Sequence, residues 1–260
     1  MTGVLALAWL VTTLQGVAAA ASVSPPPGIA CSQSEPAFDI WVTAHEAFRA
    51  RHYTEAARCF TLATPAAEHA RQLAVRYGAF QQSSPSVYEE MASDSRVFLG
   101  LSYWHNRQLL EATSAWRKSI AQREPKAITV PSRGTRLWLE RRYPSAVSAL
   151  EPYLSNEINS LIRADIKRAF SQARAGNWVS VRDLLHDAAR IDPSNKAINF
   201  LLGLFGLRQN DIADAQCQWL RALELSDFAP EALNQNGDLE GYDSTWLLIE
   251  SGRRVGILCR

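Results

Sequence analysis

The sequence predicts an all-α protein built from stacked helical hairpins, and two observations carry this prediction. The first is the stretch 200–226, FLLGLFGLRQNDIADAQCQWLRALELS, which reads as two short helices joined by a tight turn at 209–211. Its second helix places Ala215, Trp219 and Ala222 at i, i+4 and i+7, which is one face of a helix with 3.6 residues per turn. A single hairpin cannot bury such a face, so it needs stacked copies of itself.

The second observation is that this pattern recurs along the chain at a near-constant period. Three triplets with the same internal spacing precede it, at successive offsets of 34, 35 and 34 residues. A small residue stands twelve positions before each triplet, on the preceding helix, where it lets the two helices of a hairpin approach closely. The earlier triplets are Ala112, Trp116 and Ser119, then Ala146, Leu150 and Tyr153, then Val181, Leu185 and Ala188. The small residues are Gly100, Gly134, Ala169 and Gly203.

These repeats resemble the tetratricopeptide repeat (TPR) family, whose units are helix–turn–helix hairpins with a period of ~34 residues. The residues that carry the resemblance are Leu99, Gly100, Tyr103, Ala112 and Trp116 in one unit, and Gly176, Trp178, Ala188, Asp192 and Pro193 in another. The chain departs from the family pattern at Ser119, Tyr153 and Val181, where alanine is usual. The resemblance covers roughly residues 93–227 and implies a right-handed α-solenoid of stacked TPR-like hairpins.

The first 21 residues have the character of a secretory signal peptide. They contain no charged side chain, and an apolar run over 4–11 is followed by the small residues of 17–21. Cleavage after Ala20 or Ala21 fits this pattern. The run is shorter than the ~20 apolar residues that a membrane-spanning helix needs. An uncleaved anchor or a mis-set start codon is the alternative, because no basic residue precedes the apolar run.

The rest of the chain divides around the array. The segments are a signal peptide (1–21), a Pro/Ser-rich leader (22–36), a degenerate N-terminal hairpin with an extra helix (37–92), the TPR-like array (93–227) and a C-terminal capping segment (228–260). We expect Pro65 to start the extra helix, over 66–80, and a long helix to follow over 86–105. A short helix over 244–250 would cover the open end of the last repeat.

The four cysteines suggest disulfides. An even number of cysteines together with an export signal is typical of proteins from an oxidising compartment. Four cysteines allow three pairings, and we favour Cys31–Cys59 and Cys217–Cys259, because each would tie a terminal segment to the nearest repeat. Free thiols are the alternative. No two cysteines stand two to four residues apart, so the spacing does not suit a zinc site.

Composition and motifs argue against several classes of function. The net charge is +1, so no overall field favours nucleic acid or a membrane surface. His45 and His52 are seven residues apart, whereas the zinc-protease pattern needs two histidines four apart on one helix. No Gly-rich phosphate loop or Gly-x-Ser-x-Gly elbow occurs. We therefore expect no enzyme activity, catalytic residue, metal or cofactor, no nucleic-acid partner, and no membrane contact beyond the cleavable signal peptide.

Charge is distributed unevenly along the chain. Between 107 and 142, nine basic residues stand against three acidic ones, and between 211 and 250, nine acidic residues stand against one basic residue. One interpretation is that these charges belong to solvated outer faces. The other is a bipolar array whose middle attracts an acidic segment.

The resemblance also implies where a partner would bind. In TPR proteins the first helix of each hairpin lines a concave groove that holds a peptide or helix. The corresponding residues here are Leu101, Trp104, Trp138, Ile166, Phe170, Arg174, Phe200, Leu204 and Arg208. This set is apolar apart from its two arginines, so a chaperone-type carboxylate clamp is not expected. Alternatively, the extra helix or the C-terminal tail fills the groove.

These features together predict an exported protein–protein interaction scaffold, periplasmic or secreted, that binds a protein or peptide partner in the groove. The alternatives are an envelope assembly or structural accessory protein with a self-filled groove, and an accessory subunit of an enzyme. A cleft that holds His45, Glu46 and a further histidine would favour the enzyme alternative. Exposure of Trp104 and Trp138 would separate an open groove from a filled one.

Overall fold

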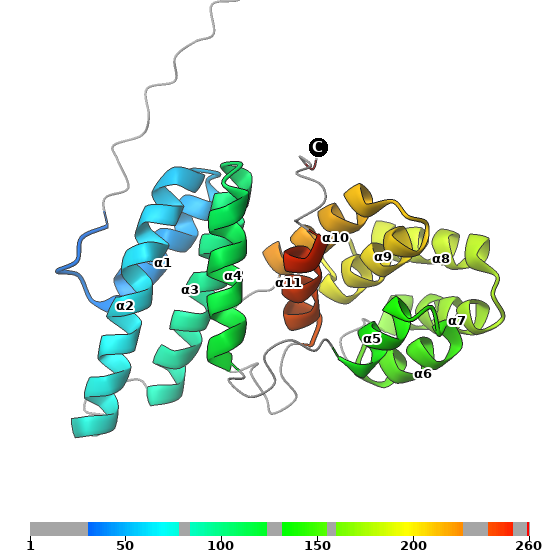
Figure 1. Ribbon diagram of the computed structural model, residues 1–260, viewed down its shortest axis with the longest axis horizontal. Coiled ribbons are helices and arrows are strands. Elements are labelled where there is room, and N and C mark those ends of the chain that lie inside the picture. The colour runs from blue at the N-terminus through cyan, green and yellow to red at the C-terminus, as the bar shows by residue number, and fades with distance from the viewer. Residues whose placement is uncertain are drawn as a thin grey trace, which may run out of the picture.

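The computed structural model describes residues 31–77, 84–123, 132–154, 160–225, 239–251 and 259, and the regular structure in these residues is entirely helical (Figure 1). The helices are α1 (Ala37–Arg49), α2 (Tyr53–Tyr77), α3 (Pro85–His105), α4 (Leu109–Arg123), α5 (Arg133–Leu139), α6 (Tyr143–Leu154), α7 (Ser160–Arg174), α8 (Trp178–Ile191), α9 (Lys196–Arg208), α10 (Ile212–Glu224) and α11 (Leu239–Ser251). The expected signal peptide and most of the leader lie outside the described residues. None of the helices described here is both long and apolar enough to span a bilayer.

Five helical hairpins follow one another along the chain, α1–α2, α3–α4, α5–α6, α7–α8 and α9–α10, and the two helices of each pack together (Figure 1). The turn of every hairpin has a residue with positive φ at the same position. These residues are Arg51, Arg107, Arg141, Gly176 and Asn210, at φ of 60° to 77°. In the second turn, Arg107 N donates to Trp104 O (2.9 Å) and Gln108 N donates to Tyr103 O (2.8 Å), which satisfies two carbonyls at the end of α3.

The first helix of a hairpin needs a small residue where a large side chain of the second helix packs against it. A Cβ added to Gly100 would lie 2.2 Å from Nε1 of Trp116, and one added to Gly203 would lie 2.2 Å from Nε1 of Trp219. At Gly134 the added atom would lie 2.5 Å from the side chain of Leu150. The close approach that the sequence predicts for these pairs is therefore present in the structure.

Helix α2 differs from the expected pair of helices. It is one helix of 25 residues with Pro65 inside it, rather than a hairpin helix followed by a second helix that starts at Pro65. Proline removes a backbone donor from the helix and crowds the preceding turn. Two threonine hydroxyls donate to backbone carbonyls there, Thr61 to Ala57 O (2.8 Å) and Thr64 to Phe60 O (3.1 Å). Packing along α3 supports the continuous helix.

The C-terminal helix α11 interrupts the expected stack. It packs against α4, α9 and α10, and Figure 1 shows it between α4 and the group α5–α10. Asp243 fixes it to the start of α5: its buried carboxylate accepts hydrogen bonds from Ser132 N (2.8 Å), Ser132 Oγ (2.5 Å) and Thr135 Oγ1 (2.6 Å). The expectation of one continuous array over 93–227 thus does not hold at the junction of α4 and α5. The helix expected over 244–250 begins earlier, at Leu239, and also packs on α10.

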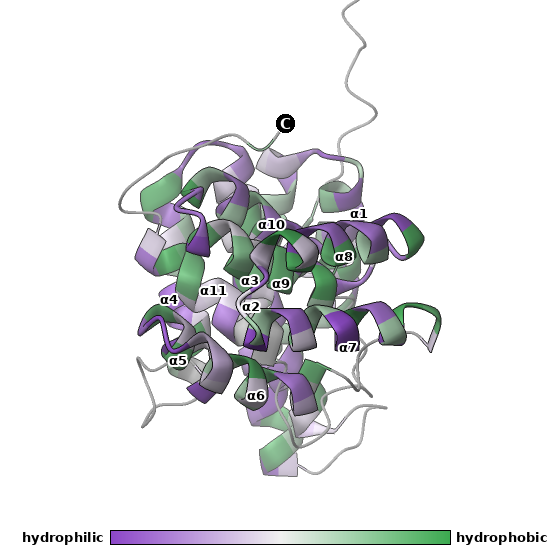
Figure 2. Ribbon diagram, turned by 90° about the vertical axis from the view of Figure 1, so that its right-hand side faces the viewer, coloured by the Kyte–Doolittle hydropathy of each residue, from purple (hydrophilic) through white to green (hydrophobic). Residues whose placement is uncertain are grey.

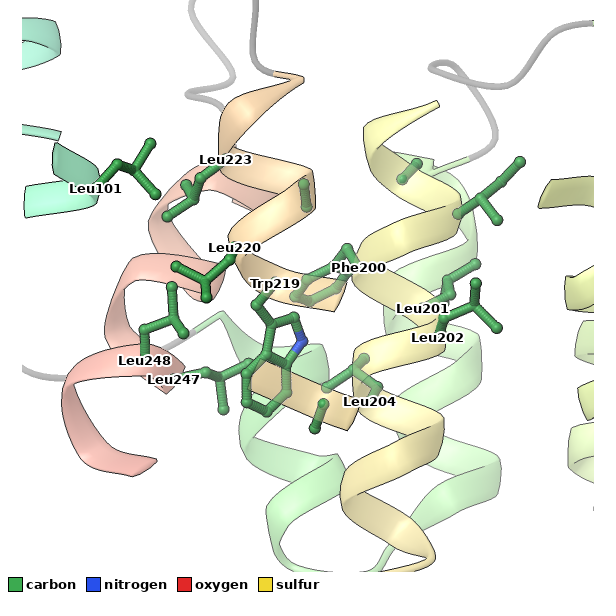
Figure 3. Close-up of a cluster of buried hydrophobic side chains, with 14 of the residues drawn as sticks. Leu101, Phe200, Leu201, Leu202, Leu204, Trp219, Leu220, Leu223, Leu247 and Leu248 are labelled. Atoms are coloured by element: carbon green, nitrogen blue, oxygen red, sulfur yellow. The ribbon is translucent and has the colours of Figure 1, made fainter. Parts of the chain in front are cut away.

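The core is continuous across this junction. Figure 3 shows Leu101 of α3, Phe200 of α9, Leu223 of α10 and Leu248 of α11 among the side chains of one cluster. Helix α9 is buried along its whole middle, whereas α7 and α8 alternate polar and apolar residues (Figure 2). A helix that is apolar all round belongs inside a protein. Helix α9 is accordingly the centre of the C-terminal half.

Candidate functional site: a cleft between the N-terminal helices and α10

A cavity of about 1100 Å³ lies between α1–α3 on one side and α10 on the other. Its walls come from segments more than a hundred residues apart in the chain. They face each other because α10 packs against α3 while α11 fills the space beside them. The cleft is not the concave groove that the resemblance implies, because it is bounded by the second helix of the last hairpin.

Aromatic rings form the wall on the N-terminal side. The positive-φ turn at Arg51 reverses the chain, so Phe48 near the end of α1 meets Tyr53 at the start of α2, with ring centroids 5.3 Å apart. Phe48 also packs edge-on against Phe98 of α3, at 5.1 Å. Tyr53 stacks on His105 at the end of α3, with centroids 4.1 Å apart and ring planes 9° apart. Tyr53 and His105 are the partly exposed rings of this wall, and Phe48 and Phe98 support them from the core, so the wall can bind an apolar side chain.

A buried carboxylate orients two residues at the base of the cleft. Asp94 Oδ2 accepts a hydrogen bond from Trp41 Nε1 (2.8 Å) and lies 2.7 Å from His45 Nε2. The His45 ring is buried and packs edge-on against Phe98 at 4.4 Å. Trp41 and His45 are therefore held in one orientation by hydrogen bonds and packing together.

A polar stripe of α10 forms the opposite wall. Asp214, Gln218 and Arg221 follow one another at i, i+4 and i+7, and Gln218 Nε2 donates to Asp214 Oδ1 (3.2 Å). At the end of α10, Glu224 Oε1 lies 2.6 Å from Nε2 of His105, which joins the two walls. The cleft thus has an aromatic wall and a polar wall connected by one histidine–glutamate contact at one end.

The charges on the rim are partly unpaired. Arg49 and Arg51 line the cleft without an ion pair to any described carboxylate. Among the described residues, Arg221 donates to Pro193 O (3.3 Å) and pairs with no carboxylate. Burial raises the pKa of Tyr53, the charge of Glu224 raises it further, and the charge of Arg51 acts in the opposite direction. The Tyr53 hydroxyl therefore stays protonated at neutral pH and can donate a hydrogen bond.

The structure places the predicted groove residues elsewhere. Seven of the nine have buried side chains: Leu101, Trp104, Trp138, Ile166, Phe170, Phe200 and Leu204. Trp138 Nε1 donates to Leu204 O (3.0 Å), so α5 and α9 meet directly across the expected groove. Arg208 lies over the ring of Trp178 at 4.1 Å, and Arg174 pairs with a glutamate of α6. At these residues the described part of the chain shows no open apolar groove, because their side chains are buried and α9 covers Trp138. Of the nine residues, Trp104 alone lines the cleft described here.

Both favoured cysteine pairs are disulfides in the structure. Cys31 is joined to Cys59, and both are buried against the first hairpin. Cys217 of α10 is joined to Cys259, and both line the cleft. The C-terminal disulfide therefore belongs to the site, which the sequence alone did not indicate.

The requirements for the enzyme alternative are met only in part. The cleft contains His45 and His105, but Glu46 is exposed and is not part of its lining. Among the described residues, no group of three or more histidines, cysteines and acids could hold a metal ion. Sequence reasoning missed the cleft because its two walls share no motif. The one sequence feature that pointed to the cleft was Cys217, because its expected partner, Cys259, also lines the cleft.

The chain has no match among known proteins in three comparisons. No protein-family model, no curated protein and no solved structure is detectably similar to it.

Proposed function

We propose that this protein is an exported, non-catalytic interaction module of TPR type, and that it binds a peptide segment of a protein partner in the cleft between α1–α3 and α10. The observation that carries the proposal is the construction of the cleft, with an aromatic wall opposite a polar helix stripe in a volume of about 1100 Å³. That volume slightly exceeds the range of ~300–1000 Å³ for small-molecule pockets, so it suits several residues of a peptide.

Two features support an oxidising location. Both disulfides stabilise structure only where thiols are not kept reduced, as in a periplasm or outside the cell. The apolar N-terminal run with its small residues fits export to such a compartment.

A peptide-display selection on the purified, disulfide-bonded protein tests the proposal. Gln218→Trp places a large ring in the cleft, and His186→Trp places the same ring on the exposed face of α8 as a matched control. Selected peptides should bind the His186→Trp variant like the wild type and should lose binding to Gln218→Trp. Selection of no peptide, or of peptides that bind Gln218→Trp unchanged, would refute the proposal.

A structural accessory role is the second candidate, and the burial of Trp104 and Trp138 favours it. A chain that fills its own groove can act as a rigid spacer without binding a peptide. In that case the display selection yields no cleft-dependent ligand, whereas deletion of the protein disturbs an envelope assembly.

A further inference from the structure

We propose that the ligand of the cleft is an acidic peptide segment that also contains aromatic or aliphatic side chains. This inference rests on the proposed function and adds the chemical class of the ligand. It combines two features of the lining: arginines without an ion pair to a described carboxylate, and the aromatic rings that lie beside two of them.

The carboxylates of the cleft are already engaged. Glu224 contacts His105 at 2.6 Å, and Asp214 accepts a hydrogen bond from Gln218 at 3.2 Å. Asp214 also lies in the first turn of α10, where the helix dipole stabilises a negative charge. Each of these carboxylates therefore already has one polar partner within the protein.

The three arginines of the cleft form no ion pair with a described carboxylate. Arg49 is exposed in the last turn of α1, Arg51 is exposed in the α1–α2 turn, and neither pairs with a described carboxylate. Arg221 makes one hydrogen bond to a backbone carbonyl and keeps further donors. Guanidinium groups bind carboxylates through paired, charge-assisted hydrogen bonds. The lining therefore has three arginines against two acids, and this positive balance favours an anionic ligand.

The apolar contacts lie beside these arginines. Phe48, Tyr53 and His105 form a continuous series of ring contacts that begins in the same α1–α2 region as Arg49 and Arg51. In a ligand that alternates acidic and apolar side chains, the acidic side chains can pair with the arginines while the apolar side chains pack on the rings. A purely acidic ligand would leave the rings in water, and a purely apolar one would leave the arginines unpaired.

Fluorescence anisotropy with two labelled octapeptides tests the inference. One peptide alternates glutamate with phenylalanine and leucine, and the other carries lysine in place of every glutamate. The acidic peptide should bind about tenfold more tightly, since each exposed ion pair contributes roughly 1.4- to 5-fold and the three arginines act together. Its affinity should fall as salt concentration rises.

Two matched variants locate the charge effect. Arg51→Asn and Arg107→Asn each replace an arginine of a hairpin turn with φ of 62°, but only Arg51 lines the cleft. Asparagine tolerates this backbone conformation, so neither change should unfold the protein. Arg51→Asn should weaken binding of the acidic peptide about threefold and Arg107→Asn should leave it unchanged.

The outcomes separate the two proposals. If both peptides bind equally and Gln218→Trp abolishes binding of both, the cleft binds peptides but the acidic class is wrong. If the lysine peptide binds more tightly, the acidic class is also wrong. If neither peptide binds, the acidic class is overturned, and the display selection decides separately whether the cleft binds any peptide.

Discussion

Replacement of Gly203 by alanine tests the packing that defines the hairpin. The added Cβ would lie 2.2 Å, 2.5 Å and 2.8 Å from three atoms of the Trp219 indole. Contacting carbon atoms are normally ~3.5–4.0 Å apart, so the ring would have to move by more than about 1 Å. Trp219 is 1% exposed and has no free space into which to move without disturbing its neighbours.

The expected loss follows from two opposing effects. Alanine is better than glycine inside a helix by about 1 kcal/mol, and overpacking of a buried site costs about 1–3 kcal/mol. Because three atoms of a rigid buried ring are involved, we take the upper end and expect a net loss of about 2 kcal/mol in the free energy of unfolding. The assay is urea denaturation followed by circular dichroism at the helical minimum.

The chain supplies its own controls for this experiment. In the third repeat of the array Ala169 stands opposite Leu185, so a methyl group is compatible with leucine at this place. Gly134→Ala, which faces the flexible Leu150, should therefore change stability by less than about 0.5 kcal/mol. In the Gly203→Ala, Trp219→Leu double variant, the two changes should be coupled favourably by about 1–3 kcal/mol. A Gly203→Ala variant that is as stable as wild type, or a coupling of zero, would refute the reasoning.

Three further predictions concern a tryptophan pair, a buried acid and a disulfide. Trp116→Phe should cost about 1 kcal/mol more than Trp219→Phe in urea denaturation, because Trp116 Nε1 donates to a backbone carbonyl of α3 (3.1 Å) whereas Trp219 Nε1 is buried without a partner among the described residues. Burial raises the pKa of Asp243 above the value of the unfolded chain, and its hydrogen bonds from Ser132 and Thr135 only partly oppose this. Ionisation therefore disfavours the fold: the contribution of Asp243 is complete below its unfolded pKa and is lost as pH rises through the raised pKa. Relative to Asp243→Asn, wild type should lose stability from pH 4 to pH 7, and a constant difference across this range would contradict the assignment. Under mild reduction, alkylation and mass spectrometry should detect the exposed Cys259 and its partner Cys217 before the buried N-terminal pair, and the reverse order would show that the C-terminal disulfide is the protected one.

The hairpin was predictable from sequence because its packing is local. Gly100 contacts Trp116 and Gly203 contacts Trp219, each across sixteen residues of chain, so the pattern of small and large residues records the contact directly. The disulfides were predictable for a related reason, since each cysteine pair lies at one end of the chain. The positive-φ turns were not anticipated. At three of these turns the residue with positive φ is an arginine: Arg51, Arg107 and Arg141. Glycine and asparagine are the residues that signal this backbone conformation in a sequence.

The sequence by itself therefore predicted most of the helices, the pairing of consecutive helices and their apolar stripes, but not that α2 continues through Pro65. Tertiary structure alone decided which element covers each stripe. An apolar stripe indicates that one face of a helix is buried, but any apolar surface of suitable shape can cover that face. Trp138 is covered by α9. Helix α4 is covered by α11, which comes more than a hundred residues later in the chain. The cleft arises in the same way, because its aromatic wall and its polar stripe are brought together only by the packing of α10 against α3.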